Sequence, residues 1–525
     1  ASTTTAITST PEELNALDGI TAVVGELNAL DIGATAIGTA VASKAVILDA
    51  NKDYTGVRNL TISGELDAAT LDISGAIDVA GTTNLDVVDV DGAVNFAADV
   101  TFADGADIIT ASAGTSNFRA GVNAGNSIAS GGNYNVVVGD EAGTAITTGD
   151  NNVALGYKAL FTEDTGNRSV AIGDFSLQNQ NNADSNYNTA VGYNSGLAVT
   201  TGIRNTLIGG LAGDALTDAD LNVAVGYGSL DNDTLGSRST ALGAFTLGQQ
   251  TLTTATNTYN TAVGYAAGNS ISSGIQNTLI GGLAGDAITT ASNNTAMGYG
   301  SLGANTTGTS NVAIGAAALD ANTTASGNNA IGHSALGANT TGASNIAIGQ
   351  QALTTNTTGI NNTAIGHVAL GDNTTADNNT AVGYLALNAN TTGTENVAVG
   401  AYALDANTTA DRNTAFGYNS LGAVTTGDQN TAVGYNALAA NTGEYNVAMG
   451  EQAMVANTSG NYNTGLGYRA LALNTTANYN TAVGNQALYA NTTGANNTAV
   501  GYAALVANTT GSQNTAVGRL ALDAN

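Results

Sequence analysis

A repeat of about 17 residues dominates the sequence, and this period constrains the fold more than any other feature. A representative unit is NTAVGYAALVANTTGSQ, residues 497–513, and 23 units that carry this signature begin between residues 135 and 514. A degenerate copy at residues 117–121 opens the array. Because so short a unit cannot enclose a core by itself, each unit is expected to contact mainly its neighbours, as the turns of a solenoid do.

Inside the unit, counted from the Asn of the signature, position 5 is Gly in all 23 copies. This uniformity indicates a positive φ or a close approach of two backbones. Position 4 is always large and apolar, and position 9 is Leu in most units. We predict two short strands, at positions 2–4 and 8–11, each with one bulky residue directed inward. A helix is disfavoured, because Gly and Asn-Thr-Thr recur in every unit.

A second recurring position is 12, which from residue 294 onward is Asn in 13 of 14 units, with Val424 the exception. In a stack of parallel turns, equivalent residues lie about 4.8 Å apart, so amides can bond to one another and hold a tight turn. We therefore predict a structural ladder of Gly and Asn residues, which includes Gly139, Gly315, Gly349, Gly434, Gly518, Asn305, Asn322, Asn339, Asn491 and Asn508.

These patterns predict an all-β parallel β-solenoid of about 24 rungs over residues 117–525, irregular over 117–293 and regular over 294–525. At strand spacing this is a rod on the order of 110 Å long. Residues 186–216 and 258–288 are near copies, and each follows a lengthened turn, at 179–187 and 249–259. These two loops are candidates for lateral contacts, and an insertion without function is the alternative.

The first 116 residues differ in texture and hold 17 acidic and 3 basic residues. Residues 1–31 repeat the segment LNALD, and Thr10, Pro11 and Glu13 predict a short helix over 11–18. Residues 32–116 alternate apolar and polar residues between glycines, which predicts an acidic stem of short strands. The chain therefore divides into an N-terminal segment, a stem and a repeat shaft.

Composition excludes several functions. The chain has no Cys, so it has no disulfide, thiol nucleophile or Cys-based metal site, and its formal charge of −29 argues against nucleic-acid binding. No apolar run approaches the roughly 20 residues of a membrane span. No recurring carboxylate pair, Ser-His-Asp set or phosphate loop is present, so we predict no catalytic residue, no cofactor and no enzymatic activity.

Position 6 carries Tyr in ten of the 23 units, and both histidines fall on it. His333 and His367 could bind a metal only if this position faced a threefold axis, and a His replacing a Tyr on a half-exposed stripe is the simpler interpretation. The Tyr stripe is interpreted as an interchain or groove-covering surface, with sugar stacking as the alternative. Its members include Tyr157, Tyr193, Tyr227, Tyr299, Tyr435 and Tyr502.

The N-T-A-V-G unit, followed by Ala-Leu and a Gly-bearing turn, resembles the haemagglutinin-type head repeat of trimeric autotransporter adhesins over residues 117–525. The LNALDGIT segment within 13–31 and the acidic strands of about 57–116 are similar to bacteriophage tail fibres. The resemblance implies a left-handed β-roll and a homotrimer. The period departs from the family, because it is longer than the usual rung of the adhesin heads.

The function that follows from the resemblance is that of a bacteriophage tail fibre, a structural virion protein that mediates attachment to the host surface. Its expected partners are two further copies of itself, tail or baseplate proteins at the N-terminal end, and a host glycan or protein receptor. We expect the receptor to bind through a distal tip of the fibre. The alternative is a trimeric adhesin on a bacterial surface. A polysaccharide-degrading tailspike and an ice-binding solenoid are less favoured.

Overall fold

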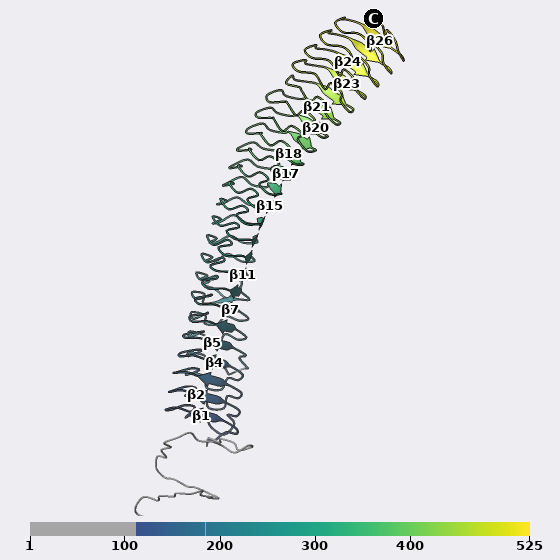
Figure 1. The fold of residues 1–525 in the computed structure, drawn as a ribbon. Coiled ribbons are helices and arrows are strands. Elements are labelled where there is room, and N and C mark those ends of the chain that lie inside the picture. The colour runs from purple at the N-terminus through teal and green to yellow at the C-terminus, as the bar shows by residue number, and fades with distance from the viewer. Residues whose placement is uncertain (1–111, 184, 525) are drawn as a thin grey trace, which may run out of the picture. The chain divides into compact units, whose positions relative to one another are not determined.

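The computed structural model describes residues 112–183 and 185–524, and there the chain winds into one long parallel β-solenoid (Figure 1). A parallel sheet of 24 strands runs along it, and each strand pairs in register with the equivalent strand of the next rung. Val312, for example, pairs with Asn329, 17 residues later. The predicted all-β parallel solenoid with this period is thus confirmed.

The strands are very short, because each is one side of a rung. Those of the long sheet are β1 (Phe118–Ala120), β2 (Val136–Val138), β3 (Val153–Leu155), β4 (Val170–Ile172), β5 (Thr189–Val191), β6 (Thr206–Ile208), β7 (Val223–Val225), β9 (Thr240–Leu242), β11 (Thr261–Val263), β12 (Thr278–Ile280), β13 (Thr295–Met297), β14 (Val312–Ile314), β15 (Asn329–Ile331), β16 (Ile346–Ile348), β17 (Thr363–Ile365), β18 (Thr380–Val382), β19 (Val397–Val399), β20 (Thr414–Phe416), β21 (Thr431–Val433), β22 (Val447–Met449), β23 (Thr464–Leu466), β24 (Thr481–Val483), β25 (Thr498–Val500) and β26 (Thr515–Val517).

The predicted helix at 11–18, the segment 1–31 and the stem up to residue 111 lie outside the described residues. Residues 112–116 form a loop that leads into β1.

The second strand predicted at positions 8–11 is wrong. In the rung that begins at Asn311, Ala317 and Leu319 have φ of +52° and +54°, and such left-handed residues interrupt a strand. The segment still bonds to its neighbour, because the Leu319 N–H donates to the Ala335 carbonyl at 3.0 Å. Each rung therefore has one true strand and a chain of tight turns that nevertheless stacks.

The core of each rung is thin and holds small residues beside one Leu. In the rung of β14, Ala313, Ala318 and Leu319 are fully buried. The residue at position 4, Ile314, was predicted to point inward, and this is wrong. A three-residue strand directs only its middle residue to one side, so Ala313 faces the core and Ile314 faces outward.

The glycine at position 5 makes the corner after each strand. Gly315 has φ of +129°, and a Cβ on it would lie 2.6 Å from the carbonyl carbon and oxygen of Gly332 in the next rung. The same arrangement recurs from Gly139 through Gly349 and Gly434. Both the backbone angle and the spacing between rungs therefore require glycine at this corner.

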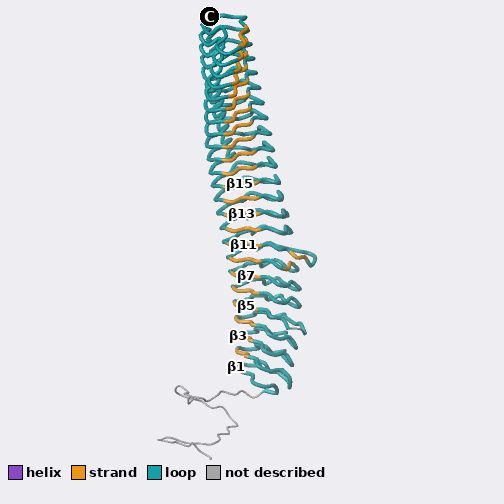
Figure 2. Tube along the Cα trace, turned by 90° about the vertical axis from the view of Figure 1, so that its right-hand side faces the viewer, coloured by secondary structure: helices purple, strands orange, loops and turns teal. Residues whose placement is uncertain are grey.

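The two lengthened turns make local pairings of their own. In the second, β8 (Gly236–Ser237) and β10 (Thr256–Asn257) form a small parallel sheet, and in the first a single bridge joins Asn167 to Ser185. Figure 2 shows the second loop extending beyond its neighbours next to β11. The insertions thus add material to the side of a rung without disturbing the long sheet.

Candidate functional site

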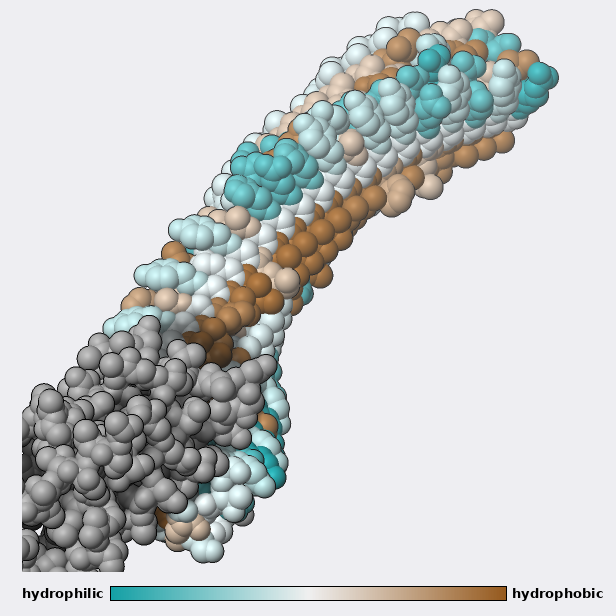
Figure 3. All heavy atoms as spheres, turned by 60° about the horizontal axis from the view of Figure 1, so that its bottom comes forward, coloured by the Kyte–Doolittle hydropathy of each residue, from teal (hydrophilic) through white to brown (hydrophobic). Residues whose placement is uncertain are grey.

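The largest surface feature is an exposed row of apolar side chains on the outer face of the sheet, which Figure 3 shows as a continuous brown band along the part of the shaft in view. Several members are far from buried, with 42% of Leu155, 49% of Met449 and 56% of Phe416 exposed. We call the position-4 residues the apolar row: Val138, Leu155, Ile172, Val191, Ile208, Val225, Leu242, Val263, Ile280, Met297, Ile314, Ile331, Ile348, Ile365, Val382, Val399, Phe416, Val433, Met449, Leu466, Val483, Val500 and Val517.

Such a long exposed apolar band is unusual for a monomeric protein. Monomeric proteins rarely expose contiguous apolar patches larger than a few hundred Å². The apolar row continues through every rung from β2 to β26, a length on the order of 100 Å at strand spacing. The apolar row is therefore the surface of the shaft to consider first for contact with another molecule.

The predicted Tyr stripe lies immediately beyond the glycine corner. Its six named members, Tyr157, Tyr193, Tyr227, Tyr299, Tyr435 and Tyr502, are 41–68% exposed. Tyr435 stacks on Tyr418 with ring centroids 5.5 Å apart, so parts of the stripe are ordered by contacts within the chain. An interchain role for these rings stays a prediction.

The two histidines each contact a neighbouring side chain. His333 Nδ1 lies 3.3 Å from Ser334 Oγ, and the ring of His367 stacks on Tyr384 at 5.6 Å. Within residues 112–183 and 185–524, no group of three or more His, Cys, Asp or Glu could hold a metal ion. A metal bound by histidines of three copies stays a hypothesis.

The Asn residues at position 12 form a buried column. Asn339 Nδ2 donates to Asn322 Oδ1 at 3.0 Å and to the Gly342 carbonyl at 2.9 Å. The same pair of bonds recurs at Asn322, Asn356, Asn373, Asn390, Asn407, Asn457, Asn474, Asn491 and Asn508. Each amide therefore closes its own turn and bonds to the rung before it.

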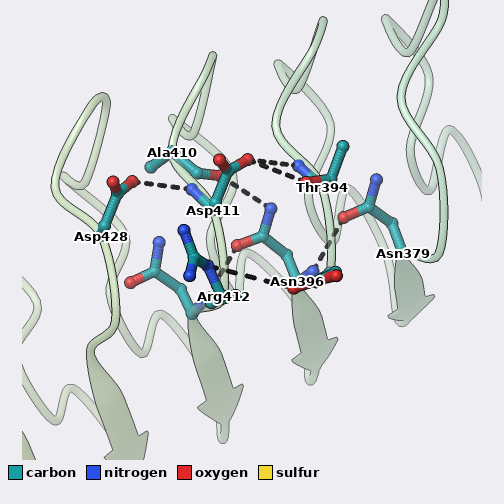
Figure 4. A network of polar contacts seen from close by, with 9 residues as sticks. Asn379, Thr394, Asn396, Ala410, Asp411, Arg412 and Asp428 are labelled. Carbon is teal, nitrogen blue, oxygen red and sulfur yellow. Dashed lines mark hydrogen bonds and ion pairs between the residues drawn. The ribbon is translucent and has the colours of Figure 1, made fainter.

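A second column, at position 1, was missed in the sequence. The Nδ2 of Asn328 also donates to the Gly342 carbonyl, at 2.9 Å, and its Oδ1 accepts the backbone N–H of Asn345 at 2.9 Å. Figure 4 shows the same geometry where Asn396 donates to Ala410 and bonds to Asn379. The signal was present, because position 1 is Asn in all but two units, but that Asn was used only to mark the start of the repeat.

In the regular rungs that have Asn at position 12, the two columns meet on one carbonyl, that of position 15. Gly342, for example, accepts from both Asn328 and Asn339. A buried carbonyl has two lone pairs, and both are satisfied here by side chains of the same rung. The shaft is thus held by two buried amide columns on either side of a shared acceptor, in addition to the sheet.

The Asn column has one gap, at Val424. Because Val424 cannot donate, Oδ1 of the preceding Asn407 is buried without a hydrogen-bond partner. We expect Val424→Asn to bond to Asn407 Oδ1 and to the Gly427 carbonyl, as the equivalent residues do. An unpaired buried acceptor costs about 1–3 kcal/mol, against roughly 1.5–3 kcal/mol for the lost burial of Val.

The new hydrogen bonds shift this balance toward Asn, and we expect Val424→Asn to raise the free energy of unfolding by about 1 kcal/mol. Thermal unfolding followed by circular dichroism measures the effect. The control is the same change in an Asn407→Ala background, where the gain is expected to disappear. An equal gain in both backgrounds would contradict the column as its cause.

In the irregular part of the shaft, two buried acids occupy position 12. Glu163 accepts hydrogen bonds from Gly166 N–H and from the side chains of Gln180 and Asn186, and burial raises the pKa of its carboxyl. Asp233 accepts from Gly236 N–H at 3.2 Å and from Gln250 Nε2 at 2.6 Å, and burial raises its pKa as well. Each acid and the Gln of the next rung replace a pair of ladder Asn residues.

We expect Asp233→Asn to stabilise the shaft in a pH-dependent way. Since the folded pKa of Asp233 lies above the unfolded value of about 3.9, the native state binds more protons between the two values and stability falls as pH rises through that window. The melting temperature of the variant should therefore exceed that of the parent at neutral pH, and the difference should vanish below about pH 3. Asp372→Asn, on an exposed side chain, is the control and should show no such trend.

Comparisons of the chain with protein-family models, with curated proteins and with solved structures found no match. The part of the chain that the structure describes contains no helix able to cross a membrane.

Proposed function

We propose that this protein is the shaft of an oligomeric fibre, a homotrimeric bacteriophage tail fibre that extends from the virion and mediates attachment to the host surface. The observation that carries the proposal is the apolar row, which places a half-buried or exposed apolar side chain on the outer face of every rung from β2 to β26. A monomeric spacer would gain nothing from this row. A fibre whose chains run side by side buries it.

The architecture supports the mechanical part of this role. Every rung bonds to the next through the strand and the stacked turns, and from Asn305 onward the two Asn columns add further bonds, with the gap at Val424. Parallel copies in register would place each apolar residue beside equivalent residues of the partner chains at the same height. Burial of this surface stabilises the assembly by about 25 cal/mol per Å² before the costs of association.

We expect the mass of the protein in solution, measured by light scattering, to be three times the chain mass of 51.6 kDa. The triple substitution Ile331→Lys, Ile348→Lys and Ile365→Lys places three charges on the apolar row and should yield a monomer. The matched control, Thr341→Lys, Thr358→Lys and Thr375→Lys, adds the same charges to exposed turn positions and should leave the mass unchanged. A monomeric parent protein would refute the oligomeric fibre.

The place where the protein is found distinguishes a phage tail fibre from a bacterial surface adhesin. Antibodies raised against residues 294–525 should label the tails of purified phage particles in electron micrographs. Labelling of the surface of intact bacteria in the absence of phage would instead favour a trimeric surface adhesin.

A further inference from the structure

The duplicated, irregular part of the shaft contains a shallow cavity that the apolar row does not account for. It has a volume of about 240 Å³ and adjoins a second hollow of about 440 Å³, with which it shares Asn232 and Gln249. Its apolar lining is Phe245 and Tyr265, whose rings lie edge to face with centroids 6.1 Å apart. Tyr265 is 60% exposed and Phe245 40% exposed, so both rings are open to a ligand.

Polar groups face the same cavity across a glycine. Gly248 lies between Asp231 of the rung before and Asn269 of the rung after, and a Cβ on it would be 3.2 Å from Asp231 Oδ1 and 2.8 Å from Asn269 Oδ1. Gly248 is therefore the floor of the cavity, and two oxygen acceptors flank that floor. The amides of Asn232 and Gln249 add both donors and acceptors at the rim.

A similar aromatic cluster occurs earlier in the shaft, but it lacks the polar residues that line this cavity. Tyr157, Phe175 and Tyr193 form an edge-to-face cluster like that of Tyr227, Phe245 and Tyr265. In the first cluster the positions that correspond to Asp231, Gly248 and Asn269 are Phe161, Gln178 and Leu197. Aromatic packing alone thus does not require the glycine floor or the acid and amide beside it.

We propose that the cavity around Gly248 binds a pyranose ring of a neutral surface glycan. The apolar face of a sugar ring can lie against Tyr265 and Phe245, while its hydroxyls donate to Asp231 and Asn269 and bond to Gln249. A small, mostly apolar ligand does not need this many polar groups, and the net charge of −29 disfavours an anionic ligand. The inference rests on the attachment function proposed above for its biological meaning, and it places glycan contact on the shaft as well as at any distal tip.

The state of Asp231 agrees with this assignment. Burial raises the pKa of its carboxyl. Burial first, and then the charge of Asp231, raises the pKa of the neighbouring Asp214 to about 6. Asp231 has one side-chain donor, Asn232 Nδ2 at 3.3 Å. Sugar hydroxyls would supply the further donors that an acceptor-only carboxylate can use.

Saturation-transfer NMR on the full chain tests the proposal. The probes are the methyl glycosides β-D-galactopyranoside, β-D-glucopyranoside and α-D-mannopyranoside, which differ only in hydroxyl orientation and anomeric configuration. We expect transfer to the ring protons of at least one probe. Tyr265→Ala should weaken its binding roughly tenfold, because a stacking face and its buried area are lost.

Three variants keep the result interpretable. Tyr193→Ala removes the equivalent ring of the other cluster and should leave sugar binding unchanged. Gly248→Ala fills the floor and should abolish binding, whereas Gly337→Ala, at the same position of a rung that does not line the cavity, should not. Absence of transfer from all three glycosides, or equal transfer in the parent and Tyr265→Ala, overturns the proposal. The sugar-binding assay is independent of the mass measurement. Sugar binding can therefore be refuted while the trimer is confirmed, and the trimer can be refuted while sugar binding is confirmed.

Discussion

Gly315→Ala is expected to destabilise the shaft by at least about 3 kcal/mol and to open the rungs on either side of it. At φ of +129° a residue with a Cβ is strained, and the added carbon would lie 2.6 Å from backbone atoms of Gly332. The rung can accept the methyl group only by moving away from its neighbour, which breaks the sheet and both Asn columns there. Hydrogen exchange of the amides around β14 and β15, with a thermal melt of the full chain, measures the effect.

Substitutions at two other glycines distinguish the backbone strain from the collision with the next rung. Gly518 has a similar φ of +128°, but a Cβ there would meet only Ala521 Cβ at 3.9 Å, so Gly518→Ala should show the strain of about 1–3 kcal/mol without the collision. Gly337 has no strained φ, and a Cβ there would lie 3.3 Å from the Ser334 carbonyl oxygen, so Gly337→Ala should cost far less than Gly315→Ala. If Gly315→Ala proved as mild as Gly337→Ala, the glycine column would not set the rung spacing.

Asn345→Ala is expected to cost about 3 kcal/mol, because it removes a buried amide that makes two side-chain bonds. Asn345 Nδ2 donates to the Gly359 carbonyl at 2.8 Å, and its Oδ1 accepts the backbone N–H of Asn362 at 2.9 Å. After truncation the Asn362 N–H is buried without an acceptor, and Gly359 keeps only the bond from Asn356. Thermal unfolding and exchange of the Asn362 amide measure the loss.

The matched control is Asn345→Ser, since Ser occupies position 1 naturally at Ser169 and Ser239. A hydroxyl can still bond within the rung, so we expect a loss well below that of Ala. Equal losses for Ser and Ala would show that burial of the side chain, and not its hydrogen bonds, accounts for the stability of this column.

Much of the shaft could be predicted from its period. A 17-residue unit with one invariant Gly and recurring Asn-Thr-Thr excludes helices and requires stacked turns, and the register of every strand pair follows from the repeat. The Asn residues at position 12 were also identified, because a repeated polar residue in a stack must meet its own copies. These inferences depend only on the translation that relates one rung to the next.

The direction of side chains within a rung could not be obtained in this way. Ile314 is bulky and apolar and was predicted to point inward, yet the structure buries Ala313 and leaves Ile314 half-buried on the outer face. The left-handed residues Ala317 and Leu319 turned a predicted strand into a series of turns, and no local pattern indicates φ above zero at Leu. The cavity at Gly248 likewise depends on residues from three rungs that the sequence does not bring together.

The repeat alone predicted that this chain stacks, with what period, and through the glycines at position 5 and the asparagines at position 12, because the same translation relates every position of one rung to the next. Which face of each rung lies inside became clear only from the three-dimensional fold. That choice depends on how the corner at Gly315 and the turns around Leu319 close the rung upon itself. The resulting interior holds Ala and Leu, and the apolar row faces outward.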